Sequence, residues 1–139
     1  MPKQTIPTLG EVMTASPTTI DINATLSQAK VLMEQLGVDH LPVMDNEVVE
    51  TIVSDRDIKR FTLPAHELRE DEEPLVRDIT PVRASLADFN DPLDRVLDVM
   101  HDRHVSAVIV LKEGELAGIF TETDACGLLA SLLRETASK

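Results

Sequence analysis

The sequence contains very few aromatic residues and a single cysteine. Its 139 residues include three phenylalanines, no tryptophan and no tyrosine. A hydrophobic core must therefore be built from aliphatic side chains and methionine, and the apolar fraction of 42% is large enough to supply one. Because Cys126 has no second cysteine to pair with, an intrachain disulfide is excluded, and no feature points to an oxidising compartment.

Positive charge is also scarce. Thirteen Lys and Arg residues stand against 25 Asp and Glu residues, which gives a formal net charge of −12. This excess of negative charge opposes non-specific binding to nucleic acid and to anionic membranes. The first residues, MPKQTIPTLG, lack an apolar signal core, and no run approaches the roughly 18 apolar residues of a membrane span. We therefore expect a cytoplasmic protein that binds neither membranes nor nucleic acid.

Two segments of the chain repeat each other. Residues 26–57 align without a gap with residues 93–124. The apolar pattern agrees along the whole alignment, and the identical pairs are Leu26/Leu93, Met33/Met100, Val38/Val105, Val43/Val110, Ile52/Ile119 and Asp57/Asp124. An internal repeat of this length indicates two structural units of the same kind.

The first copy predicts a helix followed by two strands. Thr25 and Gln28 form a capping-box pattern at the start of the helix, and Gly37 is a typical helix terminator. Alternating apolar residues predict strands over 38–44 and 48–54.

The second copy predicts the same elements. Asp91 is the expected N-cap of its helix, with Pro92 at the first helical position, and strands are predicted over 105–111 and 115–121. A closing helix follows, on which Cys126 is expected to be a small core residue. This helix carries Ala125, Leu128, Leu129, Leu132 and Leu133, which is more apolar surface than one small core requires.

These elements predict an α+β fold. One unit of two short strands and two helices cannot cover both faces of its own sheet, whereas two units packed through their small sheets can. We therefore expect two pseudo-symmetric units with helices outside, over residues 9–63 and 75–134, joined by an acidic linker at 64–74.

A polar rim follows the second strand of each copy. The stretches TIVSDRDIKR (51–60) and GIFTETDACG (118–127) each place a hydroxyl, at Ser54 or Thr121, three residues before an aspartate. This spacing fits a helix N-cap with its N3 acid, and it also fits a ligand site at the mouth of a strand. Both interpretations stay open on the sequence alone.

The motifs around these rims resemble a known family. The first copy has VMT (12–14), HLPVMD (40–45) and TIVSDRDI (51–58), and the second has DIT (78–80), VSAVIVL (105–111) and GIFTETDA (118–125). Together they resemble the tandem cystathionine β-synthase (CBS) domain pair, the Bateman module, over nearly the whole chain.

The resemblance implies a regulatory module without enzymatic activity. Such a module would bind an adenosine-containing ligand, namely AMP, ADP, ATP or S-adenosylmethionine, in the clefts between its units and signal in trans to a separate effector protein. It would form a homodimer and need neither a covalent cofactor nor a metal ion. The alternative function is that of a ligand-free scaffold, which only dimerises or docks onto a partner protein.

The resemblance also implies roles for particular residues. Asp57 and Asp124 would bind the ribose hydroxyls, with Ser54 and Thr121 as their hydroxyl partners. The adenine walls would be Val38, Asp39 and His40 in one half and Val105, Ser106 and Ala107 in the other. Thr14 and Thr80 would line the clefts from the opposite side. The remaining expected ligand-binding residues are Arg56, Gly118 and Thr123.

The two rims differ in two respects. Thr51 stands where the family pattern and the second rim, at Gly118, have glycine. Arg56, Lys59 and Arg60 follow the first rim, whereas no basic residue closely follows the second. Each half therefore remains a candidate for the ligand site.

Overall fold

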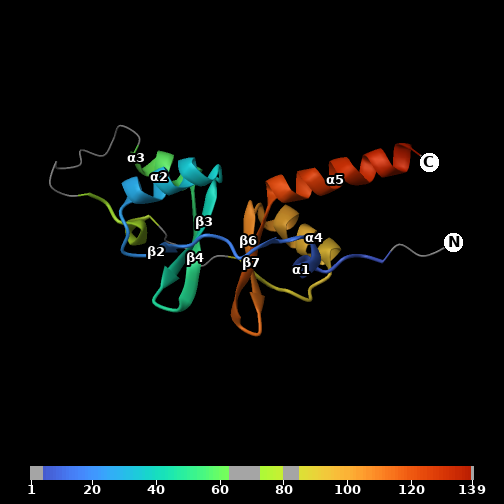
Figure 1. Cartoon of the computed structure of the whole chain (residues 1–139), viewed down its shortest axis with the longest axis horizontal. Helices are drawn as coiled ribbons and strands as arrows, with labels where there is room; N and C mark the ends of the chain where they lie inside the picture. Colours follow the sequence, from blue (N-terminus) through green and yellow to red (C-terminus); the bar gives the residue numbers. More distant parts are fainter. Residues whose placement is uncertain (1–4, 63–72, 80–84, 139) are drawn as a thin grey trace. The chain divides into compact units, whose positions relative to one another are not determined.

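The computed structural model describes residues 5–62, 73–79 and 85–138 of the chain (Figure 1). It is an α+β fold with two small sheets, as the sequence predicts. The chain forms two compact units. One consists of residues 17–84, and the other combines residues 1–16 with residues 85–139. They are named here the 17–84 unit and the 85–139 unit.

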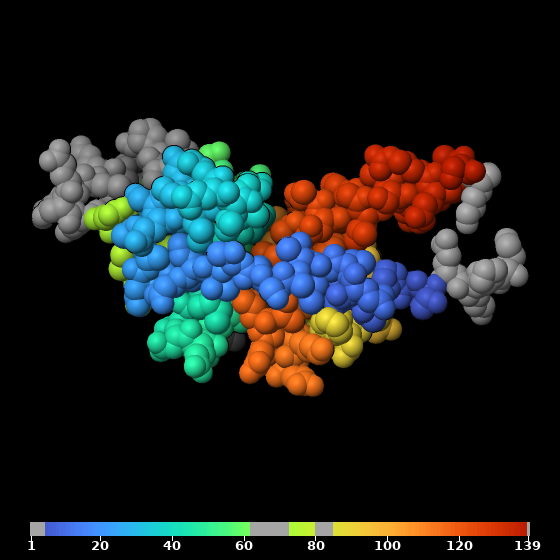
Figure 2. All heavy atoms as spheres, viewed as in Figure 1, coloured from blue at the N-terminus to red at the C-terminus, as the bar shows by residue number. Residues whose placement is uncertain are grey.

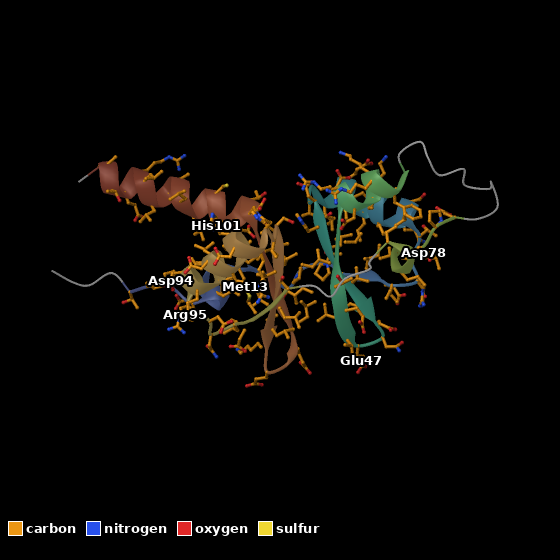
Figure 3. All side chains as sticks on the ribbon, turned by 180° about the vertical axis from the view of Figure 1, so that it is seen from behind. Met13, Glu47, Asp78, Asp94, Arg95 and His101 are labelled. Carbon is orange, nitrogen blue, oxygen red and sulfur yellow. The ribbon has the colours of Figure 1, made fainter. Side chains whose placement is uncertain are left out.

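The 17–84 unit contains a three-stranded sheet. The strand order is β2 (Ile20–Asp21), β3 (His40–Asp45) and β4 (Val48–Ser54), with β2 parallel and β4 antiparallel to β3. The β3–β4 hairpin turns at Asn46, whose φ is 57°, and the neighbouring Glu47 marks the hairpin tip in Figure 3. Both strands are those predicted from the apolar pattern, to within two residues.

Two helices and a short 3-10 helix cover this sheet. They are α2 (Leu26–Leu36), α3 (Asp55–Thr62) and η1 (Val76–Asp78). The capping box of α2 is formed, because the Gln28 N–H donates to Thr25 Oγ1 at 3.1 Å and the Thr25 N–H donates to Gln28 Oε1 at 2.9 Å. The core consists of Ile20, Leu26, Ala29, Met33, Leu41, Val43, Val53, Ile58, Val76 and Ile79.

The 85–139 unit contains a four-stranded sheet in the order β1-β7-β6-β5. Its strands are β1 (Thr14–Ala15), β5 (Leu86–Asp88), β6 (Ala107–Lys112) and β7 (Glu115–Thr121). β5 is parallel to β6, and β7 is antiparallel to both β6 and β1. The bounds of β7 are those predicted from the sequence.

The helices of the 85–139 unit are α1 (Leu9–Val12), α4 (Leu93–Arg103) and α5 (Glu122–Ala137). α4 places its apolar stripe in the core and its charged residues outside, and Figure 3 labels Asp94 and Arg95 near one end and His101 near the other. The core consists of Leu9, Leu93, Val96, Met100, Val108, Val110 and Phe120.

The segment that precedes each sequence repeat packs into the unit that is opposite to expectation: residues before the first repeat join the core of the 85–139 unit, and residues before the second repeat join the core of the 17–84 unit. Leu9, which precedes the first repeat, is fully buried in the core of the 85–139 unit. Val76 and Ile79, which precede the second repeat, are buried in the core of the 17–84 unit. Isolated bridges hold these segments, because Thr8 pairs with Pro92 and Leu75 pairs with Thr25. Each unit is therefore completed by a segment that precedes the other repeat.

Helix ends follow the prediction in the first repeat and differ in the second. Gly37 is the C-cap of α2 in the left-handed conformation, with φ of 67°. The expected N-cap at Asp91 is wrong, since Pro92 occupies the N-cap position of α4 without a side-chain bond. The Asp91 carboxylate instead accepts a hydrogen bond from the Asp88 N–H at 2.9 Å and closes the preceding turn.

α5 buries none of its described residues. Leu128, Leu129, Leu132 and Leu133 are all exposed, and Leu133 keeps 59% of its surface accessible. Cys126 is also exposed, so the expectation that it is a core residue is wrong. The reason is that only the first turn of α5, at Ala125, packs against the core of its unit.

Candidate functional site

The rim of the 85–139 unit lies where β7 ends and α5 begins. The Thr121 N–H and hydroxyl both donate to Asp124 Oδ2, at 2.9 and 3.1 Å. The Asp124 N–H donates in return to Thr121 Oγ1 at 3.2 Å. This reciprocal arrangement is a capping box, which satisfies the free N–H groups of the first helical turn. The capping interpretation of the motif is therefore realised.

Thr14 brings a third residue to this rim. β1 pairs with β7 so that Thr14 lies opposite Ile119. Its hydroxyl donates to Asp124 Oδ1 at 3.5 Å, a long bond. The two carboxylate oxygens thus have different partners, because Oδ2 belongs to the cap and Oδ1 faces Thr14.

The strand beside this rim carries the residues expected as an adenine wall. Ala107 is buried and pairs with Thr121, which places the start of β6 directly beside the motif. The Ser106 carbonyl accepts from the Glu122 N–H at 2.9 Å, so it also holds the first turn of α5. Val105 is half-buried and its N–H donates to the Met100 carbonyl at 2.9 Å.

Gly118 serves internal packing in this unit. A Cβ at this position would lie 2.4 Å from Met13 Sδ and 2.7 Å from the Thr14 carbonyl oxygen. Real Cβ atoms do not approach so closely, so the absence of a side chain lets the 13–14 segment close onto β7. Gly118 is thus needed to position Thr14, a role that the sequence reading did not identify. Met13 belongs to the VMT motif at 12–14, but the sequence analysis assigned it no role, and its contact with Gly118 was not predicted.

The rim of the 17–84 unit repeats the carboxylate and hydroxyl arrangement. The Ser54 N–H donates to Asp57 Oδ2 at 3.0 Å, and the Asp57 N–H donates to Ser54 Oγ at 3.1 Å. His40 pairs with Ser54 as Ala107 pairs with Thr121. The Asp39 carbonyl accepts from the Asp55 N–H at 2.8 Å, which matches the bond between Ser106 and Glu122. The two rims therefore have the same backbone construction.

The charges around the two rims differ. α3 carries Arg56, Lys59 and Arg60, and Lys59 Nζ lies 2.8 Å from Asp55 Oδ2. The hydrogen bond with Asp55, together with the attraction of its charge, raises the pKa of Lys59. Arg56 and Arg60 are exposed and form no ion pair with any residue that the structure describes. Both helices begin with two acidic residues, Asp55 and Asp57 on α3 and Glu122 and Asp124 on α5, so the rims differ in their basic residues. The basic residue of α5 is Arg134, in its last turn.

The structure brings most of the expected ligand-binding residues together within each unit. Thr123 is exposed on the first turn of α5, and Val38 is exposed two residues before the start of β3. Thr51 is buried in β4, on the same side of the strand as the core residue Val53. Thr80 lies outside the described residues.

The described part of the chain offers neither a metal-binding cluster nor a membrane-spanning helix. No group of three or more His, Cys, Asp and Glu side chains within it is placed to hold a metal ion. None of its helices combines the length and the apolar character that crossing a membrane requires.

Comparison with known proteins connects this geometry to a family. The family model described as CBS domain matches residues 9–63 and again residues 76–131. A structure of a protein from Vibrio cholerae named for acetoin utilization (AcuB) is 24% identical, covers 97% of this chain and 98% of its own, and superposes with a TM-score of 0.80.

Two similar structures contain adenosine ligands. The CBS domain pair of protein MJ0100, in complex with 5′-methylthioadenosine and S-adenosyl-L-methionine, is 20% identical, covers 91% of this chain and 98% of its own, and has a TM-score of 0.79. CBSX2, in complex with AMP, is 20% identical, covers 90% of this chain and 97% of its own, and has a TM-score of 0.74. At these identities the likeness concerns the fold.

Proposed function

This chain belongs to the CBS domain family, as a tandem pair, and we propose that it is a regulatory module that binds an adenosine-containing ligand at its rims. The observation that carries the proposal is the duplicated rim, in which a carboxylate and a hydroxyl stand at the end of a strand with matching hydrogen bonds. The complexes of MJ0100 and CBSX2 with adenosine compounds support this ligand class.

The proposed chemistry uses groups that the structure places at each rim. A carboxylate accepts hydrogen bonds from the two hydroxyls of a ribose, and such charge-assisted bonds are stronger than neutral ones. Asp124 offers Oδ1 for this purpose, since Oδ2 is occupied by the cap. The strand residues beside the rim, Ser106 and Ala107, have small side chains that leave room for a purine ring.

Because basic residues lie near one rim only, the two rims are expected to prefer adenosine compounds of different charge. Arg56 and Arg60 on α3 attract phosphate groups at the rim of the 17–84 unit. At the rim of the 85–139 unit, Glu122 and Asp124 have no basic residue beside them on the first turns of α5, which favours an uncharged or cationic adenosine compound, such as S-adenosylmethionine. We therefore assign AMP, ADP or ATP to the Asp57 rim and S-adenosylmethionine to the Asp124 rim.

We propose that the occupied module signals to a separate effector protein and that it acts as a homodimer. The exposed leucines of α5 support the homodimer, because a helix with this much apolar surface gains stability when a second helix covers it. The proposed role is regulatory and involves no catalytic step.

Calorimetric titration with AMP, ADP, ATP and S-adenosylmethionine tests the ligand class. At a ligand concentration of about 100 times the dissociation constant, binding should stabilise the folded state by roughly 2.7 kcal/mol, which a melting experiment detects. Absence of binding to all four compounds at millimolar concentration would reject the proposal.

The second candidate function is a ligand-free docking scaffold. It is favoured by the completeness of both capping boxes, which account for Ser54, Asp57, Thr121 and Asp124 without any ligand. The scaffold predicts a silent titration together with a dimer in solution, whereas the regulatory module predicts heat of binding.

A further inference from the structure

A cavity lies on the 17–84 unit, and the rim residues are not part of its walls. It has a volume of about 600 Å³, and its walls come from β2, from the turn into α2, from one flank of α2 and from Glu73. The atoms of β2 and α2 (blue to cyan) are on the face that Figure 2 shows. The rim residues Ser54 and Asp57 do not line it. Pockets of about 300–1,000 Å³ with mostly apolar walls are typical of small-molecule sites.

The floor of the cavity is apolar. Ile20 is buried at the base, Ala24 and Leu32 are half-buried, and Val31 is half-exposed. Gln28, Val31, Leu32 and Gln35 lie on one side of α2, while the core residues Leu26, Ala29 and Met33 lie on another. The cavity therefore follows the helix for about two turns, or roughly 11 Å.

Both charged residues among those that line the cavity are acidic. They are Asp21 and Glu73, and no Lys or Arg of the described residues lines it. One oxygen of Asp21 accepts from the Asn23 N–H at 2.7 Å, and Asp21 forms no ion pair with any residue that the structure describes. Arg77 belongs to the same unit but donates to Asn23 Oδ1 and is not among the lining residues. Lys30 is not among the lining residues, although it lies one helical turn after the lining residue Ser27.

From this combination we propose that the cavity binds a small organic cation with an apolar body. The apolar body would lie against Ile20, Ala24 and Leu32, and its ammonium group would face Asp21 and Glu73. An anion of the same size would be repelled by both carboxylates. The site is independent of the adenosine rims, since the two share no residue.

Three probes with one apolar body test the charge preference. We would titrate ¹⁵N-labelled protein with 2-phenylethylammonium, 2-phenylethanol and 3-phenylpropionate and follow the amide signals. An amine of about nine non-hydrogen atoms is expected to bind with a dissociation constant of about 1 mM. It should bind about two- to fivefold more tightly than the alcohol, because partly exposed charge pairs contribute modestly. The shifted signals should be those of residues 19–35 and Glu73.

Matched variants locate the binding. Val31→Arg places a long cation in the mouth of the cavity and should abolish binding of the ammonium probe. Val48→Arg is its control, because Val48 is 60% exposed, Val31 is 50% exposed, and Val48 does not line the cavity. Glu73→Gln should remove most of the preference for the amine over the alcohol. The variants Asp57→Asn and Asp124→Asn should bind the probes as the wild type does, which separates this site from the adenosine rims.

Several results would overturn the proposal. They are absence of signal shifts at 10 mM ammonium probe, equal binding of the propionate, and unchanged binding in Val31→Arg. Loss of probe binding in Asp57→Asn or Asp124→Asn would place the cation at an adenosine rim instead.

Discussion

The hydroxyl of Thr14 lies 3.5 Å from Oδ1 of Asp124, so that a residue near the start of the chain contacts the first turn of its last helix. The other oxygen, Oδ2, is engaged by Thr121. Among the residues that the structure describes, Thr14 alone donates to Oδ1. Because 3.5 Å is long for a bond between oxygens, a ribose hydroxyl can displace Thr14 at small cost. Capping and the proposed ligand binding would therefore use different oxygens of one carboxylate, so that one does not exclude the other.

The first prediction concerns this carboxylate. Asp124→Asn keeps one acceptor for the Thr121 N–H but removes the charge that would accept from a ribose. Because hydrogen bonds to charged groups contribute about 1.5–3 kcal/mol, ligand affinity at this rim should fall at least about tenfold. The melting temperature without ligand should barely change, since an amide oxygen at this N3 position still accepts from the Thr121 N–H of the capping box. Calorimetry with S-adenosylmethionine and thermal denaturation measure the two effects.

Asp57→Asn is the corresponding change at the other rim and should weaken AMP, ADP or ATP binding. Asp98→Asn is the control, because Asp98 is an exposed aspartate on α4 outside both rims. Unchanged affinity together with a loss of stability in Asp124→Asn would show that Asp124 is only a cap.

A pair of glycine substitutions should have effects of opposite sign. Gly118→Ala forces a Cβ against Met13 and the Thr14 backbone and should destabilise the protein by about 1–3 kcal/mol. Gly127→Ala meets no atom within 4 Å and lies inside α5, so it should stabilise the helix by up to about 1 kcal/mol. Urea denaturation of both variants measures the free energy of unfolding. Equal effects would contradict the close approach of the 13–14 segment to β7.

Truncation of Leu9 should weaken the core of the second repeat rather than the first. Leu9 is fully buried among residues of the 85–139 unit, and Leu9→Ala should lower the free energy of unfolding by about 2–5 kcal/mol. Hydrogen exchange should show the largest loss of protection in β6 and β7. The matched variant Val76→Ala should instead affect β3 and β4. Loss of protection in β3 and β4 after Leu9→Ala would refute the exchange of segments.

Charges introduced on α5 should dissociate the proposed homodimer. Leu129 and Leu133 are more than half exposed in the chain by itself, so Leu129→Glu with Leu133→Glu should leave the fold intact and produce a monomer. Light scattering at tens of micromolar measures the mass. Leu86→Glu serves as the control, because Leu86 is 57% exposed on β5 rather than on α5. A wild-type mass of 15.3 kDa, that of one chain, would rule out the dimer.

Local patterns predicted the elements that depend on neighbours in sequence. The strands β4 and β7, the capping box at Thr25 and the terminator Gly37 follow from side-chain alternation and backbone conformation, and the structure confirms them. The predicted cap at Asp91 is wrong, because its carboxylate accepts from the Asp88 N–H in the preceding turn and Pro92 is the N-cap of α4.

What local patterns could not predict depends on contacts between distant residues. The two-residue strands β1 and β2 are too short to show alternation and exist because longer strands lie beside them. The burial of Leu9 with Phe120 and the placement of Thr14 beside Asp124 have no local signal. The sequence marks Gly118 as a glycine of the family pattern, but the packing of Met13 against it depends on a contact between residues far apart in the chain.

The exchange of segments also determines an order of events during protein synthesis. Leu9 is made before either repeat, whereas Met100 and Phe120, which belong to the same core, are made within the second repeat. The segment around Leu9 therefore cannot pack into its core until the second repeat has been made, whereas we expect the continuous 17–84 unit to fold once its own residues have left the ribosome. Limited proteolysis of stalled nascent chains should find β3 and β4 resistant while the segment around Leu9 is still cut. Simultaneous protection of both would contradict this order.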